Sequence, residues 1–364
     1  MLSIGLDIGG ANTKVSVVSF DQNLPVGAIC QSIRVESLDV HYLPLWEKLP
    51  DLQGFLESIL SRFSMKPHIT TYTMTAELAD CFNTKADGVK EITSIVGSIE
   101  PRSRAFLNDG EIIAPGGEHV EPDKVAAANW VAPALLIGSM LKNAIYLDAG
   151  STTTDIIPVT DGLPRVEDRS DLGRLANNNL VYTGALRTNV ATIVDHVMLD
   201  GKKTGIASEN FSTIADVNLV LGLITPDEYT VPTSDGRPAE IPEALCRLSR
   251  VVCSDRDHLS TEQILEIANY IHHAQISRIA NNLQELLDNH FGMKKPPCII
   301  AGIGFSCLAE PAAKSAGLSE IISFHDLLRS TLAIQYRGSE TKVSTAAPAI
   351  SLSLLRAMRF PECG

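Results

Sequence analysis

The chain carries the same strand-turn-strand pattern twice, and this repeat restricts its fold more than any other feature. Residues 2–20 contain two runs rich in Ile and Val around a turn of small residues, and residues 143–160 repeat the arrangement. Both segments are typical of β-hairpins. When the aspartates that end the first strands are aligned, Asp7 falls on Asp148, and the first glycine of each turn also coincides. Such a duplication predicts two similar half-molecules that face each other.

The length and composition agree with two folded halves. A chain of 364 residues exceeds what one hydrophobic core usually supports, and 45% of its residues are apolar. Its formal net charge of −13 would repel a phosphodiester backbone, because nucleic-acid binding depends on clustered Lys and Arg. We therefore expect small-molecule partners and no nucleic acid. Backbone amides or a metal ion can still attract an anionic substrate locally.

The chain shows no sign of export or of membrane insertion. Seven scattered cysteines, an odd number without a Cys-x-x-Cys pair, argue against a disulfide framework or a zinc site. The N-terminus begins with a strand pattern and not with a charged leader. The longest apolar stretch, 130–141, is too short to span a bilayer and contains Pro133, so we expect a buried helix there. These points predict a cytoplasmic protein without membrane contact, and they leave a homo-oligomer open.

Hydrophobic periodicity and end signals predict the other elements. A Ser-x-x-Gln capping box at Ser260 opens the longest of them, an amphipathic helix that continues to Gly292. The other expected elements are helices at 51–63, from Ala76, from Pro122 through Trp130, after Gly304 and at 344–358, and strands at 69–74 and 297–301.

The first turn has the composition of a phosphate-binding loop. Gly9 and Gly10 allow successive backbone N–H groups to converge on an anion, and Asn12 and Thr13 add side-chain donors. Lys14 is a further phosphate-binding candidate. Asp7 would repel phosphate directly, so we expect it to hold Mg²⁺ or to position a nucleophile. Taken alone, a Gly-Gly turn is equally typical of a purely structural hairpin.

The second turn strengthens the phosphate interpretation because it offers the same groups again. Asp148 ends a strand and is followed by a turn with a glycine and three hydroxyl side chains, and a further strand is followed by Gly-x-Gly. The phosphate-binding candidates of these two segments are Gly150, Ser151, Thr152, Thr153, Gly302 and Gly304. We expect Asp148 to share catalysis and metal binding with Asp7.

The order of these three motifs resembles that of the actin/sugar-kinase/Hsp70 superfamily. Residues 182–189 and 215–222 resemble segments of its hydantoinase/oxoprolinase-like branch. Residues 7–12, 74–80, 128–130 and 147–155 are similar to the methanofuran-biosynthesis synthases of methanogens and methylotrophs. The resemblance implies an α/β, two-lobed, ribonuclease H-like fold, with duplicated domains around a central cleft. We assign residues 1–142 and 343–364 to the first lobe and residues 143–342 to the second.

The resemblance also implies a reaction that is unusual for this fold. Members of that family join an (aminomethylfuranyl)methyl diphosphate to the phenol of γ-glutamyltyramine, which forms an aryl ether and releases diphosphate. The two loops, with Mg²⁺ near Asp7 and Asp148, would stabilise the charge that builds on the departing diphosphate. A phenol has an ordinary pKa of about 10, so a base should help it to attack.

Three further residues are candidates for the acceptor side of this reaction. Glu77 follows a predicted strand within a family-like segment and is our candidate base, although an acid in a first helical turn is often merely solvated. Arg187 is a candidate for the glutamyl carboxylate and Asp216 for the amine. Either could equally belong to a structural ion pair. His272 and His273 are adjacent on a predicted helix, point in different directions and are not expected to share a metal.

Other functions remain open from the sequence. An ATP-dependent small-molecule kinase would use the same loops and would make ADP. The diphosphate-releasing transferase requires neither ATP nor ADP. The segment 301–304 contains fewer glycines than many adenosine-binding motifs. A nucleotide-sensing regulator would need a DNA-binding appendage, of which the sequence shows no sign. A hydrolase of cyclic amides is suggested only by the branch resemblance.

Overall fold

A computed structural model describes residues 1–114, 121–332 and 339–359. Its residues form two compact units. Unit 1 comprises Met1–Tyr146, Ile157–Ala176 and the chain from Ile322 onward, and unit 2 comprises Leu147–Ile156 and Asn177–Ile321. This division differs from the predicted lobe ranges, because 143–146, 157–176 and the described residues of 322–342 group with the first unit. Residues 115–120, 333–338 and 360–364 of the predicted lobes lie outside the described residues.

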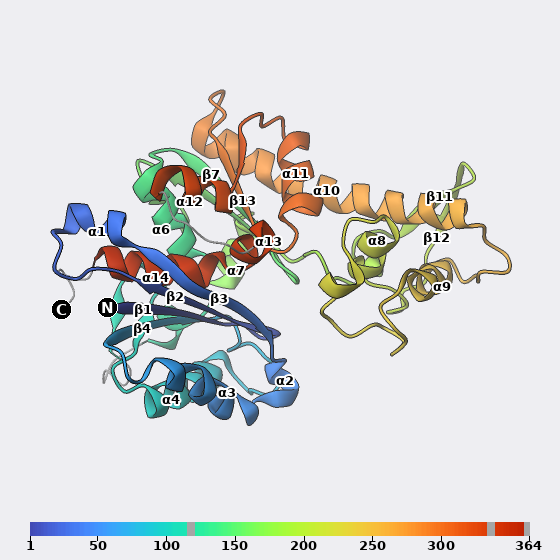
Figure 1. Ribbon diagram of the computed structural model, residues 1–364. Helices are drawn as coiled ribbons and strands as arrows, with labels where there is room; N and C mark the ends of the chain where they lie inside the picture. Colours follow the sequence, from blue (N-terminus) through green and yellow to red (C-terminus); the bar gives the residue numbers. More distant parts are fainter. Residues whose placement is uncertain (115–120, 333–338, 360–364) are drawn as a thin grey trace. The chain divides into compact units, whose positions relative to one another are not determined.

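The sheet of unit 1 has six strands in the order β3-β2-β1-β4-β5-β6 (Figure 1). Strand β1 pairs antiparallel with β2 and parallel with β4. The strands are β1 Leu2–Ile8, β2 Asn12–Ser19, β3 Arg34–Tyr42, β4 His68–Met74, β5 Arg104–Phe106 and β6 Ile112–Ile113.

A second sheet has the order β10-β8-β7-β13-β14, with β9 paired to β8. Its strands are β7 Ala144–Ala149, β8 Thr154–Thr160, β9 Leu163–Pro164, β10 Leu180–Val181, β13 Cys298–Ala301 and β14 Ile321–Ser323. Each sheet therefore has the strand that carries the Asp-x-Gly aspartate at its centre, flanked by its hairpin partner and by a strand from much later in the chain. This common order confirms the α/β fold class and the duplication predicted from the two hairpins.

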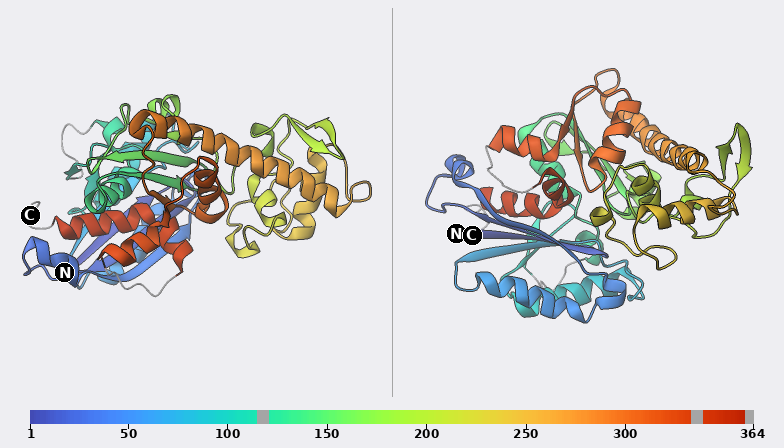
Figure 2. Two further views of the ribbon diagram at one scale, coloured as in Figure 1. Left: turned by 90° about the horizontal axis from the view of Figure 1, so that it is seen from above. Right: turned by 45° about the vertical axis from the view of Figure 1, so that its right-hand side comes forward.

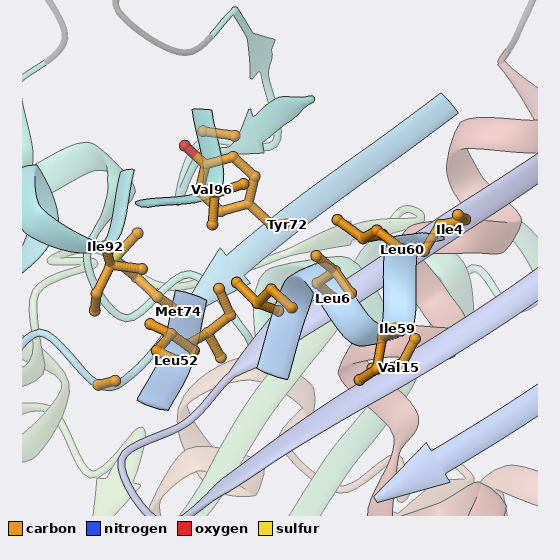
Figure 3. Close-up of a cluster of buried hydrophobic side chains, with 14 of the residues drawn as sticks. Ile4, Leu6, Val15, Leu52, Ile59, Leu60, Tyr72, Met74, Ile92 and Val96 are labelled. Atoms are coloured by element: carbon orange, nitrogen blue, oxygen red, sulfur yellow. The ribbon is translucent and has the colours of Figure 1, made fainter. Parts of the chain in front are cut away.

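Strand β1 alternates because its two faces meet different neighbours. Its apolar side chains, at Leu2, Ile4, Leu6 and Ile8, join a core cluster with helices α3 (Asp51–Leu60) and α4 (Lys85–Ile99) (Figure 3). The opposite face carries Ser3, Gly5 and Asp7, which are small or polar. Helix α14 (Ala347–Met358) covers that face, and a Cβ on Gly5 would lie 2.1 Å from the Ala349 carbonyl oxygen. Only glycine permits so close an approach.

Unit 2 is organised by the 31-residue helix α10 (Thr261–Phe291), which packs against α8 (Ile214–Val220), α9 (Ile241–Val251) and α11 (Glu310–Ser315) (Figures 1 and 2). Its N-terminus has the predicted capping box, in which the Ser260 hydroxyl accepts from the Gln263 N–H and the Gln263 side chain accepts from the Ser260 N–H. The other described α-helices and strands are α1 Val26–Ser32, α2 Leu45–Lys48, α5 Pro122–Val125, α6 Val131–Met140, α7 Asp171–Ala176, β11 His196–Leu199, β12 Lys202–Gly205, α12 Phe324–Leu332 and α13 Glu340–Thr345.

Most of the predicted elements are present, but the start of one predicted helix and the length of another are wrong. No helix starts at Ala76, because residues 75–83 form turns and α4 begins only after Thr84, whose hydroxyl accepts from the Asp87 N–H. The helix opened by Pro122 ends at Val125, and Ala127 has a left-handed φ of 49° that no helix allows. The apolar stretch forms the buried helix α6, as predicted. No helix among the described residues combines the length and apolarity needed to cross a membrane.

Candidate functional site

The two Asp-x-Gly turns are closed by the same hydrogen bond. In the first, the Gly9 N–H donates to the Asn12 carbonyl at 3.0 Å, and in the second the Gly150 N–H donates to the Thr153 carbonyl at 2.8 Å. A Cβ on Gly9 would lie 2.6 Å from the Asn12 oxygen, so the first turn needs glycine there. The duplication seen in the sequence therefore extends to the backbone geometry of the turns.

The carbonyl groups of both turns are engaged by the protein itself. Gly10 and Ala11 accept from the backbone of Leu45 and Leu43, at 2.8 and 2.9 Å. In unit 2 the Ser151 carbonyl, which is equivalent to that of Gly10, accepts from Leu186 and Arg187, and the neighbouring Gly150 carbonyl accepts from Ala185. These carbonyl oxygens are therefore not free to face a bound anion, and binding of phosphate by the remaining N–H groups of the two turns stays a prediction.

Asp7 is buried beside Lys14. The Lys14 ammonium donates to Asp7 Oδ2 at 2.6 Å, and the Asp7 side chain is 1% exposed. The second carboxylate oxygen, Oδ1, has no hydrogen-bond partner among the described residues, and neither has the buried hydroxyl of Thr13. An orphaned buried carboxylate oxygen is costly unless a ligand satisfies it. In this structure Lys14 compensates the charge of Asp7; its contact with phosphate stays a prediction.

The available carboxylates fit a magnesium ion that is held partly by substrate better than a metal ion held by protein ligands alone. Within the described part of the chain, no group of three or more His, Cys, Asp or Glu side chains could hold a metal ion. Mg²⁺ is commonly held by only one or two carboxylates together with substrate phosphates and water. The unpartnered Oδ1 of Asp7 fits that mode of binding, in which the phosphate would complete the ligand set.

In unit 2 the later glycines lie directly against the second aspartate. Gly302 has a φ of 86°, and a Cβ there would lie 2.1 Å from the Ala149 oxygen and 2.4 Å from Asp148 Oδ1. The Gly304 N–H donates to the Ala149 carbonyl at 2.8 Å. The structure thus brings the Gly-x-Gly segment, which lies far later in the sequence, against Asp148 and the second turn.

Three buried side chains that the sequence did not single out as site residues support this region. Gln275 on α10 donates to the Thr183 hydroxyl and the Gly184 carbonyl, and Asn218 on α8 donates to the Ala185 carbonyl. His272, one turn before Gln275, bonds the Cys307 carbonyl at 2.9 Å. Burial lowers the pKa of His272. This histidine therefore supports the turn after Gly304, a role distinct from metal binding.

Glu77 is a buried acid. Its side chain is 1% exposed, and its Oε2 has no partner among the residues the structure describes. Burial raises the pKa of Glu77 to about 7; its own backbone N–H and the Lys85 charge act against the rise, and the Asp171 charge adds to it. The alternative of a solvated residue in a first helical turn is wrong, because the side chain is buried and lies outside a helix.

A half-buried network of ion pairs lies near Glu77 within unit 1. Asp171, the first residue of α7, accepts from Lys85 at 2.7 Å and from Arg174 at 2.8 Å. The Arg174 guanidinium lies 5.3 Å from the ring centroid of buried Trp130, a cation–π contact. Burial acts to raise the pKa of Asp171, but the Lys85 hydrogen bond and the charges of both cations hold it below its usual value. The sequence did not reveal this network of ion pairs, because its residues are dispersed between 85 and 174.

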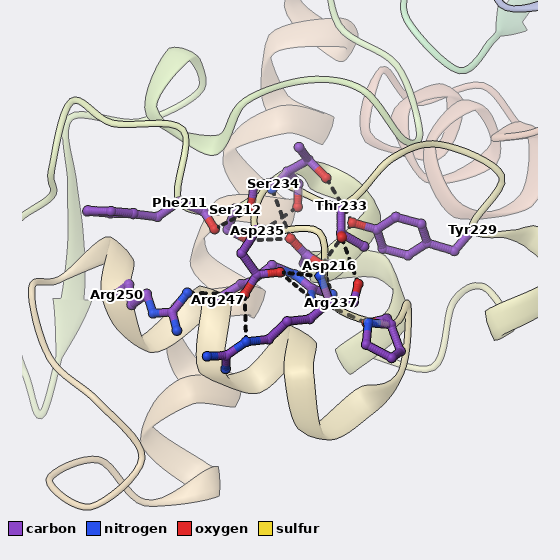
Figure 4. A network of polar contacts seen from close by, with 12 residues as sticks. Phe211, Ser212, Asp216, Tyr229, Thr233, Ser234, Asp235, Arg237, Arg247 and Arg250 are labelled. Atoms are coloured by element: carbon purple, nitrogen blue, oxygen red, sulfur yellow. Dashed lines mark hydrogen bonds and ion pairs between the residues drawn. The ribbon is translucent and has the colours of Figure 1, made fainter. Parts of the chain in front are cut away.

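The two predicted substrate residues differ in accessibility. Arg187 is exposed and its backbone N–H bonds the second turn, so its role toward a carboxylate stays a prediction. Asp216 is fully buried: it accepts from the Arg247 guanidinium at 2.8 Å and from the Tyr229 hydroxyl at 2.9 Å, and it caps α8 (Figure 4). Asp216 therefore has the alternative role, that of a structural ion-pair member, and we do not propose it as a ligand of the substrate amine.

The duplicated α/β fold, with an Asp-x-Gly hairpin at the centre of each sheet, is of the actin/sugar-kinase/Hsp70-like class. The chain belongs to the hydantoinase/oxoprolinase family, whose model matches residues 68–334. Nucleotide-free acetone carboxylase is a similar solved structure, with a TM-score of 0.50 and 12% identity over 92% of this chain and 70% of that one.

Two relatives share the name "(4-{4-[2-(gamma-L-glutamylamino)ethyl]phenoxymethyl}furan-2-yl)methanamine synthase". The protein of Methanocaldococcus jannaschii is 32% identical over 318 residues, which cover 85% of this chain and 88% of the relative. That of Methanococcus vannielii is 35% identical over 214 residues, which cover 59% of this chain and 90% of the relative. The family predicted from the sequence motifs is thereby confirmed, and these relatives are named as enzymes.

Proposed function

We propose that the chain is a transferase of methanofuran biosynthesis. It condenses (aminomethylfuranyl)methyl diphosphate with the phenol of γ-glutamyltyramine, forms an aryl ether and releases diphosphate in the cytoplasm. The observation that carries this proposal is the relationship to synthases whose name describes a phenoxymethyl link between a tyramine-type ring and a furan.

The two turns are assigned to the diphosphate. Backbone N–H groups around Gly9 and Gly150, with the nearby hydroxyls, would bind the leaving group, and Asp7 and Asp148 would hold Mg²⁺. Bound magnesium would supply positive charge to the departing diphosphate. The orphaned Oδ1 of Asp7 and the closeness of Gly302 to Asp148 support these assignments.

Glu77 is assigned as the proton acceptor. The phenol O–H bond breaks and its proton passes to the Glu77 carboxylate, while the phenol oxygen forms a bond to the furan methylene carbon. The bond between that carbon and the diphosphate oxygen breaks, and the electron pair leaves with diphosphate. A pKa of about 7 matches a general base that works near neutral pH.

The proposal is tested with purified protein, Mg²⁺ and the two substrates in the absence of nucleotide. Ether and diphosphate should appear in equal amounts. The alternative of an ATP-dependent kinase predicts no product under these conditions, and ADP formation once ATP is added. That second outcome would refute the transferase assignment.

A further inference from the structure

Lys85 acts electrostatically on Glu77, yet it is paired elsewhere. Its charge lowers the pKa of Glu77, but its ammonium donates to Asp171 at 2.7 Å. Glu77 Oε2 has no hydrogen-bond partner in the described residues. A buried carboxyl near a lysine would ordinarily pair with it, since an uncompensated buried charge is costly. Something in the fold must therefore keep the lysine away.

Asp171 is the group that occupies Lys85. It is itself anchored by Arg174, whose side chain is 3% exposed and whose guanidinium is fixed over the Trp130 ring. Asp171 therefore cannot move with Lys85 without breaking its half-buried ion pair with Arg174. The backbone on the other side of Glu77 is also fixed, because Gly88 of α4 packs against the Glu77 backbone at a distance that excludes a Cβ.

We propose that Asp171 is a positioning residue, which holds Lys85 away from Glu77 and so leaves the Glu77 carboxylate able to take a proton from a bound hydroxyl group. The identity of that hydroxyl as a phenol rests on the proposed function. The geometry separates the tasks of two neighbouring carboxyls: Asp171 is paired with two cations, and Glu77 forms no ion pair with any described residue and keeps its Oε2 without a hydrogen-bond partner. Environments that drive two acids apart in this way are typical of acid–base sites.

The proposal predicts the direction in which the proton affinity of Glu77 changes in three variants. Removing the Asp171 charge lowers this affinity for two reasons: a negative charge that raises it is lost, and Lys85 is released to pair with Glu77. Removing Lys85 raises that affinity. Removing both charges returns the affinity close to that of the unmodified protein, because the two effects oppose each other.

The proton affinity is read directly by ¹³C NMR titration of side-chain carboxyl-labelled glutamate, with Glu77 assigned from the signal lost in Glu77→Gln. Asp171→Asn should lower the Glu77 midpoint by about one pH unit or more, a tenfold change. Lys85→Met should raise it, and the double variant should lie between the two. Asp171→Ser serves in place of Asp171→Asn if the latter does not fold. Asp109→Asn, which removes an exposed partner of Lys124, is the matched control and should leave the midpoint unchanged.

A Glu77 midpoint that stays constant or rises in Asp171→Asn overturns the proposal. The acid limb of the kcat profile should move in the same direction as the midpoint, which a merely structural role of Asp171 would not produce. If the midpoint moves as expected but no variant makes ether, the proposed function fails while the positioning role stands. If ether forms and the midpoint does not move, only the positioning role fails.

Discussion

Replacing Glu77 by glutamine should stabilise unit 1 above neutral pH. The pKa of Glu77 rises from an ordinary 4.5 to about 7 because the side chain is buried. The folded protein therefore binds this proton more tightly than the unfolded chain does, and stability falls as the pH rises from about 4.5 to 7. A shift of this size corresponds to about 3 kcal/mol once Glu77 is ionised. Glutamine has nearly the same shape and carries no charge to bury.

The difference is measured by urea unfolding followed through tryptophan fluorescence. The chain has two tryptophans, Trp46 and Trp130, and both belong to unit 1, so the signal reports on that unit. Glu77→Gln should exceed the unmodified protein by about 3 kcal/mol at pH 8 and by only about 1 kcal/mol at pH 5. Glu91→Gln, at an exposed position of α4, is the matched control and should show no such pH dependence. A glutamine variant that is less stable at pH 8 would refute the buried-acid account.

Three other perturbations have defined outcomes. Asp7→Asn and Asp148→Asn should each lower kcat by about a hundredfold or more while far-ultraviolet circular dichroism stays unchanged, and full activity in either would remove its metal–diphosphate role. Gly302→Ala should destabilise unit 2 more than Gly201→Ala in thermal unfolding. Both glycines have a positive φ, but only at Gly302 would a Cβ collide with backbone atoms. Equal losses of stability would contradict that packing. Arg247→Met should cost about 3–5 kcal/mol by leaving Asp216 buried and unpaired; a loss below about 1 kcal/mol would contradict the ion-pair role.

The hairpins could be predicted because their signals are local. The alternation of Ile4 and Leu6 with Ser3 and Gly5 marks a strand with two different faces, and the glycine turns follow within a few residues. The Ser260 capping box is likewise contained in four residues. Repetition of the hairpin was sufficient to predict the duplicated sheets, because the first strand of each copy pairs with its hairpin partner and with one strand from later in the chain.

The environment of Glu77 could not be predicted, because distant segments create it. Asp171 and Lys85, whose charges act on the pKa of Glu77, are 86 positions apart. The helix expected at Ala76 is replaced by turns that place Glu77 against the backbone of Gly88. Asp216 was likewise predicted to bind a substrate amine, because its partner Arg247 lies 31 positions away and no local sequence pattern links the two. Burial of a charged residue depends on such tertiary pairing, which local patterns do not encode.

The bond-forming step is tested most directly by following the phenol oxygen. γ-Glutamyltyramine labelled with ¹⁸O at the phenol is incubated with the purified protein, Mg²⁺ and the furan diphosphate, and the products are analysed by mass spectrometry. Attack of the phenol on the furan methylene predicts that the label remains in the ether and that the released diphosphate is unlabelled. An unlabelled ether, or the absence of ether from fully folded protein, would contradict the account.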